Sequence, residues 1–420
     1  MQDSQTDTAM PNRNQLHILQ VCKKFPYPLK DGESIAIHNL SRALVRAGAR
    51  VSLLAMNTSR HPFQGDALPA ALSHYDQVEM VAIDNRIKPW DALKNLFSDK
   101  SYHIERFVSA AFAKKLAHLL QHQHYDVVQM ETIYLSPYIS VIREHSEACI
   151  SMRTHNVEHE IWERIVGNTT HGPRRWYLQH LTRKLARYER QMLSAYDLLI
   201  AISRRDLDTL SGMGFAGTGT VIPIGLDLND YERTPPTVQN GHLSMSFIGS
   251  LDWMPNVEGL RWFLQEIWPE LSSRWPELKL HIAGRNTPGW LYEQQQPGIV
   301  VHGEVPDAAA FIQQHPVMVV PLLSGSGMRA KILEGMALGK TILTTSLGLE
   351  GIDARRGKEV LVADTPQAFS RHLTFLQQHP KKILDIGAQA RQMVAKRYDS
   401  DQLGEQLLRI YQQAVCKAVS

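Results

Sequence analysis

Residues 317–351, VMVVPLLSGSGMRAKILEGMALGKTILTTSLGLEG, contain the pattern that decides the fold. The apolar run 317–323 predicts a strand, and a turn with two glycines separates it from a segment of helical spacing, 328–338. A second run rich in β-branched residues, 341–345, predicts the next strand. Because a strand, a glycine-bearing turn and a helix present the helix N-terminus to an anion, this stretch predicts a phosphate site in an α/β protein.

The same alternation of strands and helices extends in both directions along the chain. Residues 16–22, 34–47 and 50–55 read as strand, helix and strand, which favours a parallel sheet with right-handed crossovers. After ERTPPTVQNGH, which is rich in Pro, Gly and polar residues, a second α/β series begins. The predicted division is a loose tail at 1–15, an N-terminal domain at 16–230, a linker at 231–242, a C-terminal domain at 243–395 and a helix at 396–420.

We therefore predict two Rossmann-like, doubly wound domains that face each other across a cleft. In such sheets ligands bind beyond the carboxyl ends of the strands, so both domains would contribute to one site. The C-terminal helix could pack back on the N-terminal domain. A chain of 420 residues exceeds what one hydrophobic core usually supports, which agrees with two domains.

Composition excludes several classes of protein. With 43% apolar and 21% charged residues the chain is neither fibrous nor largely disordered, and a net charge of +3 does not indicate a nucleic-acid partner. Three widely spaced cysteines without a CxxC pair indicate reduced thiols. The polar start lacks the apolar segment of a signal peptide, and no run of about 18 apolar residues occurs. We expect a cytoplasmic protein, with contact at the inner face of the membrane as an open option.

The predicted helix carries a lysine and a carboxylate at informative positions. Gly327, Lys331 and Glu334 are spaced i, i+4 and i+7, which places them on one helical face. A lysine behind free backbone N–H groups suits a pyrophosphate, and a carboxylate one turn deeper suits the vicinal hydroxyls of a ribose. The alternative is a solvated Lys–Glu pair that contributes only about 0.2–0.5 kcal/mol.

Three short motifs suggest other chemistries. GSGMRA at 325–330 fits the dinucleotide fingerprint G-x-G-x-x-A, but it lies late in its domain and no acidic residue ends the next strand, so a nicotinamide enzyme is disfavoured. HNVEH at 155–159 fits the zinc-protease pattern H-x-x-E-H, but the first histidine follows a strand and precedes the helix. Asp206 and Asp208 form D-x-D on a predicted helix, where they lie on different faces and are expected to be surface charges. No metal site is expected.

Two stretches, 85–115 and 173–190, combine basic residues with aromatic ones. They could meet an anionic membrane surface that carries a lipid-linked acceptor. The alternative is a pair of solvated helix faces, since Asp91, Asp99, Glu105 and Glu189 interrupt the basic pattern. The sequence alone slightly favours the second interpretation.

Over nearly its whole length the chain resembles the GT-B-fold, retaining glycosyltransferases of family 4. The resemblance rests on FPYPLKDGESIAIHNLSRALVRAGARVSLL near the start, RTHNVE in the middle and VIPIGLD at the domain junction. It continues through FIGSLDWMPNVEGLRWF, LHIAGR and GSGMRAKILEGMALGKTIL. It implies transfer of a sugar from a nucleotide-diphospho-sugar to an acceptor hydroxyl, with retained anomeric configuration and no essential metal or other cofactor. A glycan or a lipid-linked molecule is the implied acceptor, in cell-surface polysaccharide or glycolipid biosynthesis.

The resemblance also assigns roles to residues of this chain. Glu334 matches the glutamate that binds the donor ribose, and Lys331 with the backbone of Gly327 and Met328 falls where the diphosphate is held. Lys331 would stabilise the charge on the departing diphosphate. Gly32 matches a glycine of the first loop that lets backbone approach donor and acceptor. His155 matches a histidine that faces the transferred sugar, whereas the residues alone favour a structural histidine.

Two departures from the family pattern affect the donor site. The family often has a glutamate eight positions before the second one, and this chain has Ser326 there. An Arg and a Lys that commonly follow the first strand of the C-terminal domain are absent, and Arg285, Arg329 or Lys331 could supply the positive charge. The alternatives that stay open are a GT-B nucleotide-sugar epimerase or hydrolase, a zinc hydrolase and a non-catalytic GT-B partner protein.

Overall fold

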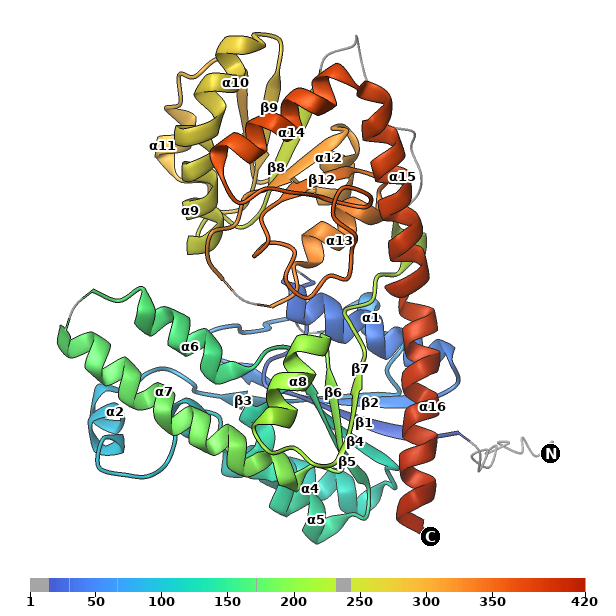
Figure 1. Cartoon of the computed structure of the whole chain (residues 1–420). Coiled ribbons are helices and arrows are strands. Elements are labelled where there is room, and N and C mark those ends of the chain that lie inside the picture. The colour runs from blue at the N-terminus through green and yellow to red at the C-terminus, as the bar shows by residue number, and fades with distance from the viewer. Residues whose placement is uncertain are drawn as a thin grey trace.

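The computed structural model contains two parallel β-sheets, each covered by helices and placed one above the other (Figure 1). It describes residues 15–29, 31–65, 67–170, 172–231, 243–325 and 327–419. The predicted tail lies outside these ranges up to residue 14, and so does the predicted linker from residue 232 onward. The two sheets are the two α/β series that the sequence predicts.

The N-terminal sheet has seven parallel strands in the order β3-β2-β1-β4-β5-β6-β7. Its strands are β1 (His17–Cys22), β2 (Arg50–Thr58), β3 (Gln77–Ile83), β4 (Val127–Met130), β5 (Cys149–Thr154), β6 (Leu198–Ala201) and β7 (Thr218–Val221). The helices of this part are α1 (Gly32–Arg46), α2 (Pro89–Asn95), α3 (Tyr102–Glu105), α4 (Ala110–His122), α5 (Ile139–His145), α6 (Glu158–Gly167), α7 (Gly172–Met192) and α8 (Arg204–Gly212). The central strands are buried along their whole length, as expected of parallel strands with helices on both faces.

The C-terminal sheet has six parallel strands in the order β10-β9-β8-β11-β12-β13. Its strands are β8 (Ser244–Ile248), β9 (Lys279–Ala283), β10 (Ile299–Gly303), β11 (Val317–Val320), β12 (Thr341–Thr344) and β13 (Leu361–Val362). Its helices are α9 (Met254–Trp262), α10 (Trp268–Arg274), α11 (Gly289–Tyr292), α12 (Ala308–Gln313), α13 (Ala330–Ala337), α14 (Pro366–Gln378) and α15 (Pro380–Arg397). In both sheets the strand order reverses next to the first strand, which creates a crevice at the carboxyl ends.

The last helix, α16 (Ser400–Val419), packs along α1 of the N-terminal part (Figure 1). Leu403, Leu407 and Tyr411 are buried in the core that α1 and β1 share, and each such side chain contributes about 1.5–3 kcal/mol. The Tyr411 hydroxyl donates a hydrogen bond of 2.6 Å to Gln129 on β4. The end of the chain therefore crosses from the second sheet to the first and ties the two parts together.

Two local expectations from the sequence are wrong. The helix predicted to begin at Met328 begins at Ala330, because Arg329, at the position before it, has an extended backbone (φ −92°, ψ 90°), and Gly327 has a left-handed one (φ +81°). Gly327 therefore does not share a helical face with Lys331. Asp206 is buried, not a surface charge, because it exchanges hydrogen bonds with Ser203 at the start of α8; Asp208 is exposed. In the part of the chain that the structure describes, no helix is long and apolar enough to cross a membrane.

Candidate active site

A cavity of about 960 Å³ opens at the carboxyl ends of β8, β9 and β10. Its floor is the backbone at Gly249 and Gly284, and α13 supplies Lys331 and Glu334 from one side. The two strand ends approach closely because residue 284 has no side chain: a Cβ there would lie 1.9 Å from the carbonyl oxygen of Gly249. The remaining walls come from the start of α12, from Tyr231 and from Leu29 and Ile35 of the N-terminal part. The cavity thus lies where parallel sheets bind ligands, between the two parts of the chain.

Lys331 is held at the edge of this cavity by the C-terminal sheet. Its Nζ donates hydrogen bonds to the carbonyl oxygen of Ile248 (3.1 Å) and to Oδ1 of Asn256 (2.8 Å), and it lies 5.1 Å from the centre of the Phe247 ring. Burial, with a smaller effect of the nearby Arg329 charge, lowers the pKa of Lys331 to about 7. The lowered pKa means that neighbouring groups do not fully offset the cost of burying the Lys331 ammonium. An anion in the cavity would therefore stabilise its charged form.

Glu334 lies one turn further along α13, also on the cavity wall. Tyr231 donates a hydrogen bond to its carboxylate. Burial raises the pKa of Glu334, although the Tyr231 hydrogen bond and the Lys331 charge oppose that shift. Lys331 and Glu334 are therefore not a solvated surface pair: both are partly buried, and each is held by a residue from another element.

The loop before α13 leaves the helix N-terminus open. Arg329 occupies the capping position but makes no capping hydrogen bond to the helix; its guanidinium turns back to the carbonyl oxygen of Gly327 and lies 5.8 Å from the Trp253 ring. The first backbone N–H groups of α13 thus receive no side-chain cap. An uncapped helix N-terminus beside a lysine suits a bound phosphate.

The same loop touches the N-terminal part of the chain at Gly327. A Cβ on Gly327 would lie 2.6 Å from Oδ1 of Asn156 and 3.9 Å from the carbonyl oxygen of His155. Gly32, at the start of α1, faces the other side of this contact, with Ala330 Cβ 4.0 Å from the position its own Cβ would take. Gly32, His155 and Gly327 are therefore brought together where the two parts of the chain meet.

His155 is oriented by a buried carboxylate. Its Nε2 lies 2.9 Å from Oε2 of Glu131, and this oxygen also accepts a hydrogen bond from Arg153. The other carboxylate oxygen, Oε1, accepts hydrogen bonds from Gln20 and Gln129. Burial would raise the pKa of Glu131, but the Arg153 charge and the His155 hydrogen bond outweigh it and lower the pKa to about 2. With Nε2 engaged, the other ring nitrogen, Nδ1, is the one available to a ligand.

Charged side chains link the two parts next to this contact. Arg164 on α6 bonds the carbonyl oxygen of Gly325, and its Nη2 lies 3.4 Å from Oε1 of Glu350. Arg205 on α8 lies 3.9 Å from the same Glu350 oxygen and forms an ion pair of 2.5 Å with Glu160. These contacts hold the glycine-bearing loop against the N-terminal part.

Two family models match the chain: Glycosyltransferase Family 4 over residues 31–230 and Glycosyl transferases group 1 over residues 243–379. The chain belongs to the family 4, or group 1, glycosyltransferases. Sucrose-phosphate synthase from Thermosynechococcus elongatus has the same fold, with a TM-score of 0.69, 16% identity and coverage of 97% of this chain and 100% of that one. HepE of Anabaena, solved in complex with UDP-glucose, has a TM-score of 0.61, 15% identity and coverage of 94% and 99%. The fold is GT-B.

Among curated proteins, an uncharacterised 44.6 kDa protein in the cps region of Klebsiella pneumoniae is 24% identical over 163 residues. The match covers 37% of this glycosyltransferase and 42% of that protein. The likeness is therefore confined to less than half of either chain.

The structure distributes the predicted site residues of this glycosyltransferase over three places. Arg285, Lys331 and Glu334 line the cavity. Gly32, His155, Gly327 and Met328 lie at the contact between the two parts, where Met328 packs beside Gly351. Arg329 is buried in the loop, and burial lowers its pKa to about 10. Ser326 lies outside the described residues.

The metal motifs of this glycosyltransferase have other structural roles. His155 bonds Glu131, whereas His159 bonds Glu189 on α7 at 2.6 Å, so the two histidines of HNVEH point to different partners. Glu189 also accepts backbone N–H groups at the start of α6. Within the described ranges no group of three or more His, Cys, Asp or Glu side chains could hold a metal ion.

Three residues of the site, Tyr231, Asn256 and Glu131, are not indicated by the sequence pattern. Tyr231 begins the predicted linker, and nothing near it in the sequence indicates its bond to Glu334. Glu131 directly follows the end of β4, and a polar residue at the carboxyl end of a buried strand is a usable signal.

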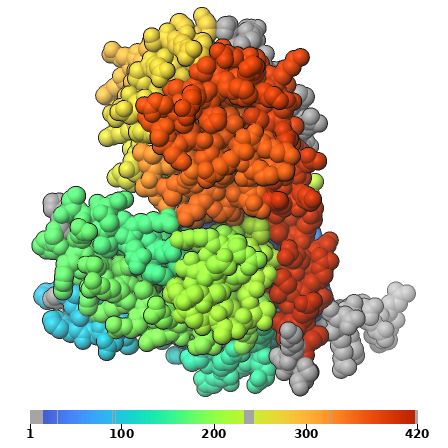
Figure 2. All heavy atoms as spheres, in the orientation of Figure 1, coloured from blue at the N-terminus to red at the C-terminus, as the bar shows by residue number. Residues whose placement is uncertain are grey.

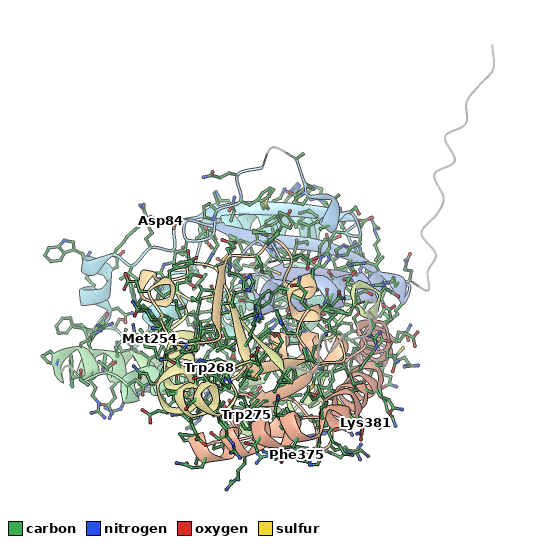
Figure 3. All side chains as sticks on the ribbon, turned by 90° about the horizontal axis from the view of Figure 1, so that it is seen from above. Asp84, Met254, Trp268, Trp275, Phe375 and Lys381 are labelled. Carbon is green, nitrogen blue, oxygen red and sulfur yellow. The ribbon has the colours of Figure 1, made fainter. Side chains whose placement is uncertain are left out.

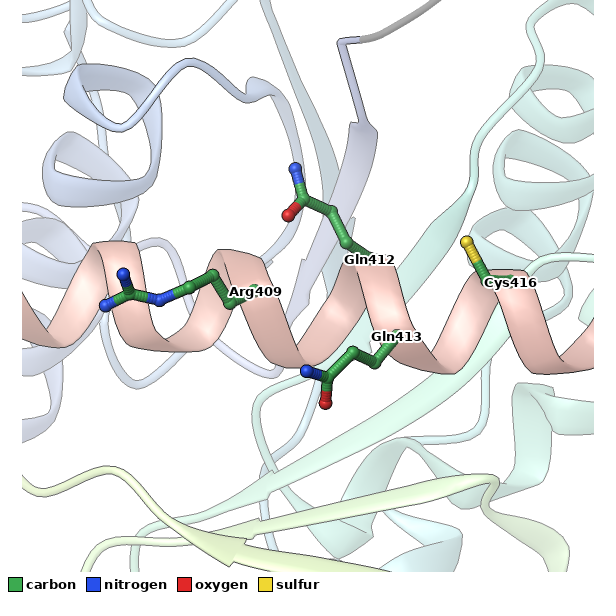
Figure 4. A pocket seen from close by; sticks show the side chains of 4 residues that line it. All are labelled: Arg409, Gln412, Gln413 and Cys416. Atoms are coloured by element: carbon green, nitrogen blue, oxygen red, sulfur yellow. The ribbon is translucent and has the colours of Figure 1, made fainter.

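A smaller surface hollow of about 380 Å³ is lined by Arg409, Gln412, Gln413 and Cys416 (Figure 4). Since all four come from α16, it is not a cleft between elements.

Replacing Gly327 by alanine should lower donor affinity about tenfold without unfolding the protein, because the new methyl group would push the loop away from Asn156 and strain a left-handed backbone. Gly357→Ala is the matched control: its φ is +75° and a Cβ there meets nothing within 4 Å. Isothermal calorimetry with the donor nucleotide and a thermal melt measure the two effects. Equal affinities of the two variants would show that the contact with Asn156 does not shape the site.

Proposed function

We propose that this glycosyltransferase moves a sugar from a nucleotide-diphospho-sugar to an acceptor hydroxyl, with retention of the anomeric configuration and without an essential metal. The main support for the proposal is the cavity at the carboxyl ends of β8, β9 and β10, which Lys331 and Glu334 line. About 960 Å³ is room for a ligand of nucleotide-sugar size. HepE, which has the same fold, was solved with UDP-glucose bound, and this supports a donor of the same class.

The diphosphate would lie between Lys331 and the uncapped N-terminus of α13. Both carry positive charge, and both are fixed before the donor arrives, Lys331 by Ile248 and Asn256. As the bond from the anomeric carbon to the diphosphate breaks, negative charge develops on the leaving oxygen and these groups stabilise it. Glu334 would accept hydrogen bonds from the ribose hydroxyls. Arg285, at the end of β9, is a further cation on the cavity wall.

The transferred sugar would lie at the contact of Gly32, His155 and Gly327. His155 would bind a sugar hydroxyl through Nδ1, since Glu131 holds Nε2. The family resemblance supports front-face attack: the acceptor oxygen bonds the anomeric carbon on the side that the diphosphate leaves, and the hydroxyl proton passes to the leaving diphosphate. The Klebsiella relative, a protein of a cps region, supports an acceptor in cell-surface polysaccharide or glycolipid biosynthesis.

A panel of nucleoside diphosphates and nucleotide sugars, screened for thermal stabilisation, tests this function and identifies the donor. A ligand at 100 times its Kd should add about 2.7 kcal/mol of stability. Stabilisation by no member of the panel would contradict the proposal and favour a non-catalytic GT-B partner protein. Turnover of the donor without any acceptor would favour an epimerase or hydrolase, and activity that chelators abolish would favour a metal enzyme.

Nucleoside diphosphate binding should weaken as the pH rises from 7 to 9. The pKa of Lys331 in the free protein is about 7, and a bound diphosphate raises it, so binding above pH 7 requires the uptake of a proton. The affinity should then fall by up to about tenfold per pH unit as Lys331 loses its proton. Calorimetry at pH 8 in two buffers of different ionisation enthalpy measures the uptake, and Lys331→Met is the control that should lose it. Absence of proton uptake in the wild type would show that Lys331 does not hold the diphosphate.

A further inference from the structure

Helix α7 carries a row of arginines on its exposed face. Trp176, Arg183, Arg187 and Arg190 are separated by 7, 4 and 3 residues, so they lie on one side of the helix, and all four are exposed. Arg174 and Arg175 extend the positive charge at the start of the helix. Three arginines thus lie along one exposed face of α7, and two more are exposed around its first turn.

No carboxylate neutralises this surface from within α7. Glu189, the sole acidic residue of the helix, is buried and holds His159 and the start of α6. Across the described part of the chain, none of the five arginines forms an ion pair. On the α2 side Arg86 pairs with Asp84 and Lys100 with Glu105, whereas the carboxylates of Asp91 and Asp99 are exposed. The arginines of α7 are thus available to an external anion.

Large aromatic side chains project beside the arginines. Trp90 on α2 is 75% exposed, Phe97 just after α2 is 90% exposed and Trp176 on α7 is 61% exposed. The Lys184 Nζ of α7 bonds the carbonyl oxygen of Asn95 at the end of α2 (2.5 Å), which ties the two helices together. Figures 1 and 3 both show α2 beside α7 at one edge of the molecule. Two stretches that are far apart in the sequence form one surface.

We propose that this α2–α7 surface docks on an anionic lipid bilayer. Aromatic rings at the water–lipid boundary insert between headgroups, and arginines bind lipid phosphates, so projecting rings among unpaired arginines fit this partner. Trp90 and Trp176 project from two helices and Phe97 from the segment after α2, each more than half exposed, which disfavours a single-stranded nucleic acid that would stack on rings lining a groove.

The α2–α7 surface lies next to an opening between the N-terminal and C-terminal parts of the chain. Arg174 also lines a second cavity of about 960 Å³, which runs between α6 and α9 to Ser324 and Gly325 of the loop before α13. Figure 2 shows a notch at this place, between the green and the yellow segments. Its walls include Ile161, Ile165 and Met254. Docking would place this opening at the lipid headgroups, and, if the proposed function holds, a lipid-linked acceptor would enter there.

The test is sedimentation of the full chain with vesicles made of equal parts phosphatidylcholine and phosphatidylglycerol, and with vesicles of phosphatidylcholine alone. The protein should bind the anionic vesicles and bind more weakly as salt rises. The triple variant Arg183→Gln, Arg187→Gln, Arg190→Gln should bind at least about tenfold more weakly, since each arginine contributes to the attraction. Trp90→Ser with Phe97→Ser should weaken binding to the same vesicles.

The matched control is Lys381→Gln, Lys382→Gln, Lys396→Gln, which removes three exposed charges from α15. Figure 3 shows Lys381 on the side of the molecule away from α2 and α7. This variant should bind vesicles like the wild type. Thermal stabilisation by the donor nucleotide checks that each variant is folded and separates failure of docking from failure of the proposed function. Equal binding to both kinds of vesicle, equal loss in both triple variants, or tighter binding to a short DNA duplex would overturn the proposal.

Discussion

Lys331→Ala and Glu334→Ala should each remove most of the affinity for the donor nucleotide. Lys331 lies on the cavity wall with a lowered pKa, and a charge-assisted hydrogen bond to a diphosphate contributes about 1.5–3 kcal/mol, or about 10- to 150-fold in Kd. Removing Glu334 leaves the ribose hydroxyls without an acceptor. The Tyr231 hydroxyl, which Glu334 also bonds, can turn to water in the cavity, so the cost falls on ligand binding more than on folding.

Calorimetric titration with the nucleoside diphosphate that the thermal panel selects measures both effects. The 2′-deoxy form of that nucleotide separates the two roles: Glu334→Ala should bind the ribose and deoxyribose forms equally, whereas Lys331→Ala should keep the preference for ribose. Lys396→Ala, an exposed lysine on α15, is the control for loss of one positive charge. Unchanged affinity in both site variants would refute the donor assignment.

The sequence predicted the parts of this site that depend on local order. Strand, glycine-bearing turn, helix and strand follow one another within 317–351, and the structure has β11, α13 and β12 there. Lys331 and Glu334 share a helical face because they are three residues apart, and that spacing survives in any fold that keeps the helix. The loop between β11 and α13 is less predictable, because the extended backbone at Arg329 moves the start of the helix from Met328 to Ala330.

The partners of these residues could not be predicted, since they come from distant parts of the chain. Lys331 is fixed by Asn256 and Ile248, 75 and 83 residues away, and Glu334 by Tyr231 from the predicted linker. Such contacts depend on how β8, β11 and the end of the N-terminal part are placed in space. No periodicity or local composition encodes that placement, so the sequence identified the reactive helix but not what positions it.

The environment of Glu131, the carboxylate that orients His155, could not be predicted from local sequence either. Its hydrogen-bond partners come from three strands of the N-terminal sheet. Gln20 on β1, Gln129 on β4 and Arg153 on β5 all bond Glu131. Both Glu131 and Arg153 are fully buried. Two opposite charges that are withdrawn from water stabilise the fold only as a pair, and the loss of one leaves the other uncompensated.

Glu131→Gln should therefore destabilise the protein by about 3–5 kcal/mol, the cost of leaving a buried charge unpaired. Glutamine has the same shape and can still accept a hydrogen bond from His155. The loss of stability would therefore come from the missing charge and not from a cavity. Urea denaturation followed by circular dichroism measures it. The matched control is Glu405→Gln, whose ion pair with Arg409 on α16 is exposed on both sides and should change stability by less than about 1 kcal/mol.

The pH dependence of this loss distinguishes the pair from other causes. In the folded protein the pKa of Glu131 is about 2, against an ordinary value of 4.5. A lowered pKa means that the carboxylate stabilises the fold fully above pH 4.5 and progressively less as the pH falls toward 2. The difference in unfolding free energy between wild type and Glu131→Gln should then narrow over that window, because the protonated glutamate becomes as neutral as glutamine. A difference that stays constant down to the acid transition would mean that the substitution disturbs packing, and that the charge of Glu131 does not hold Arg153 and His155.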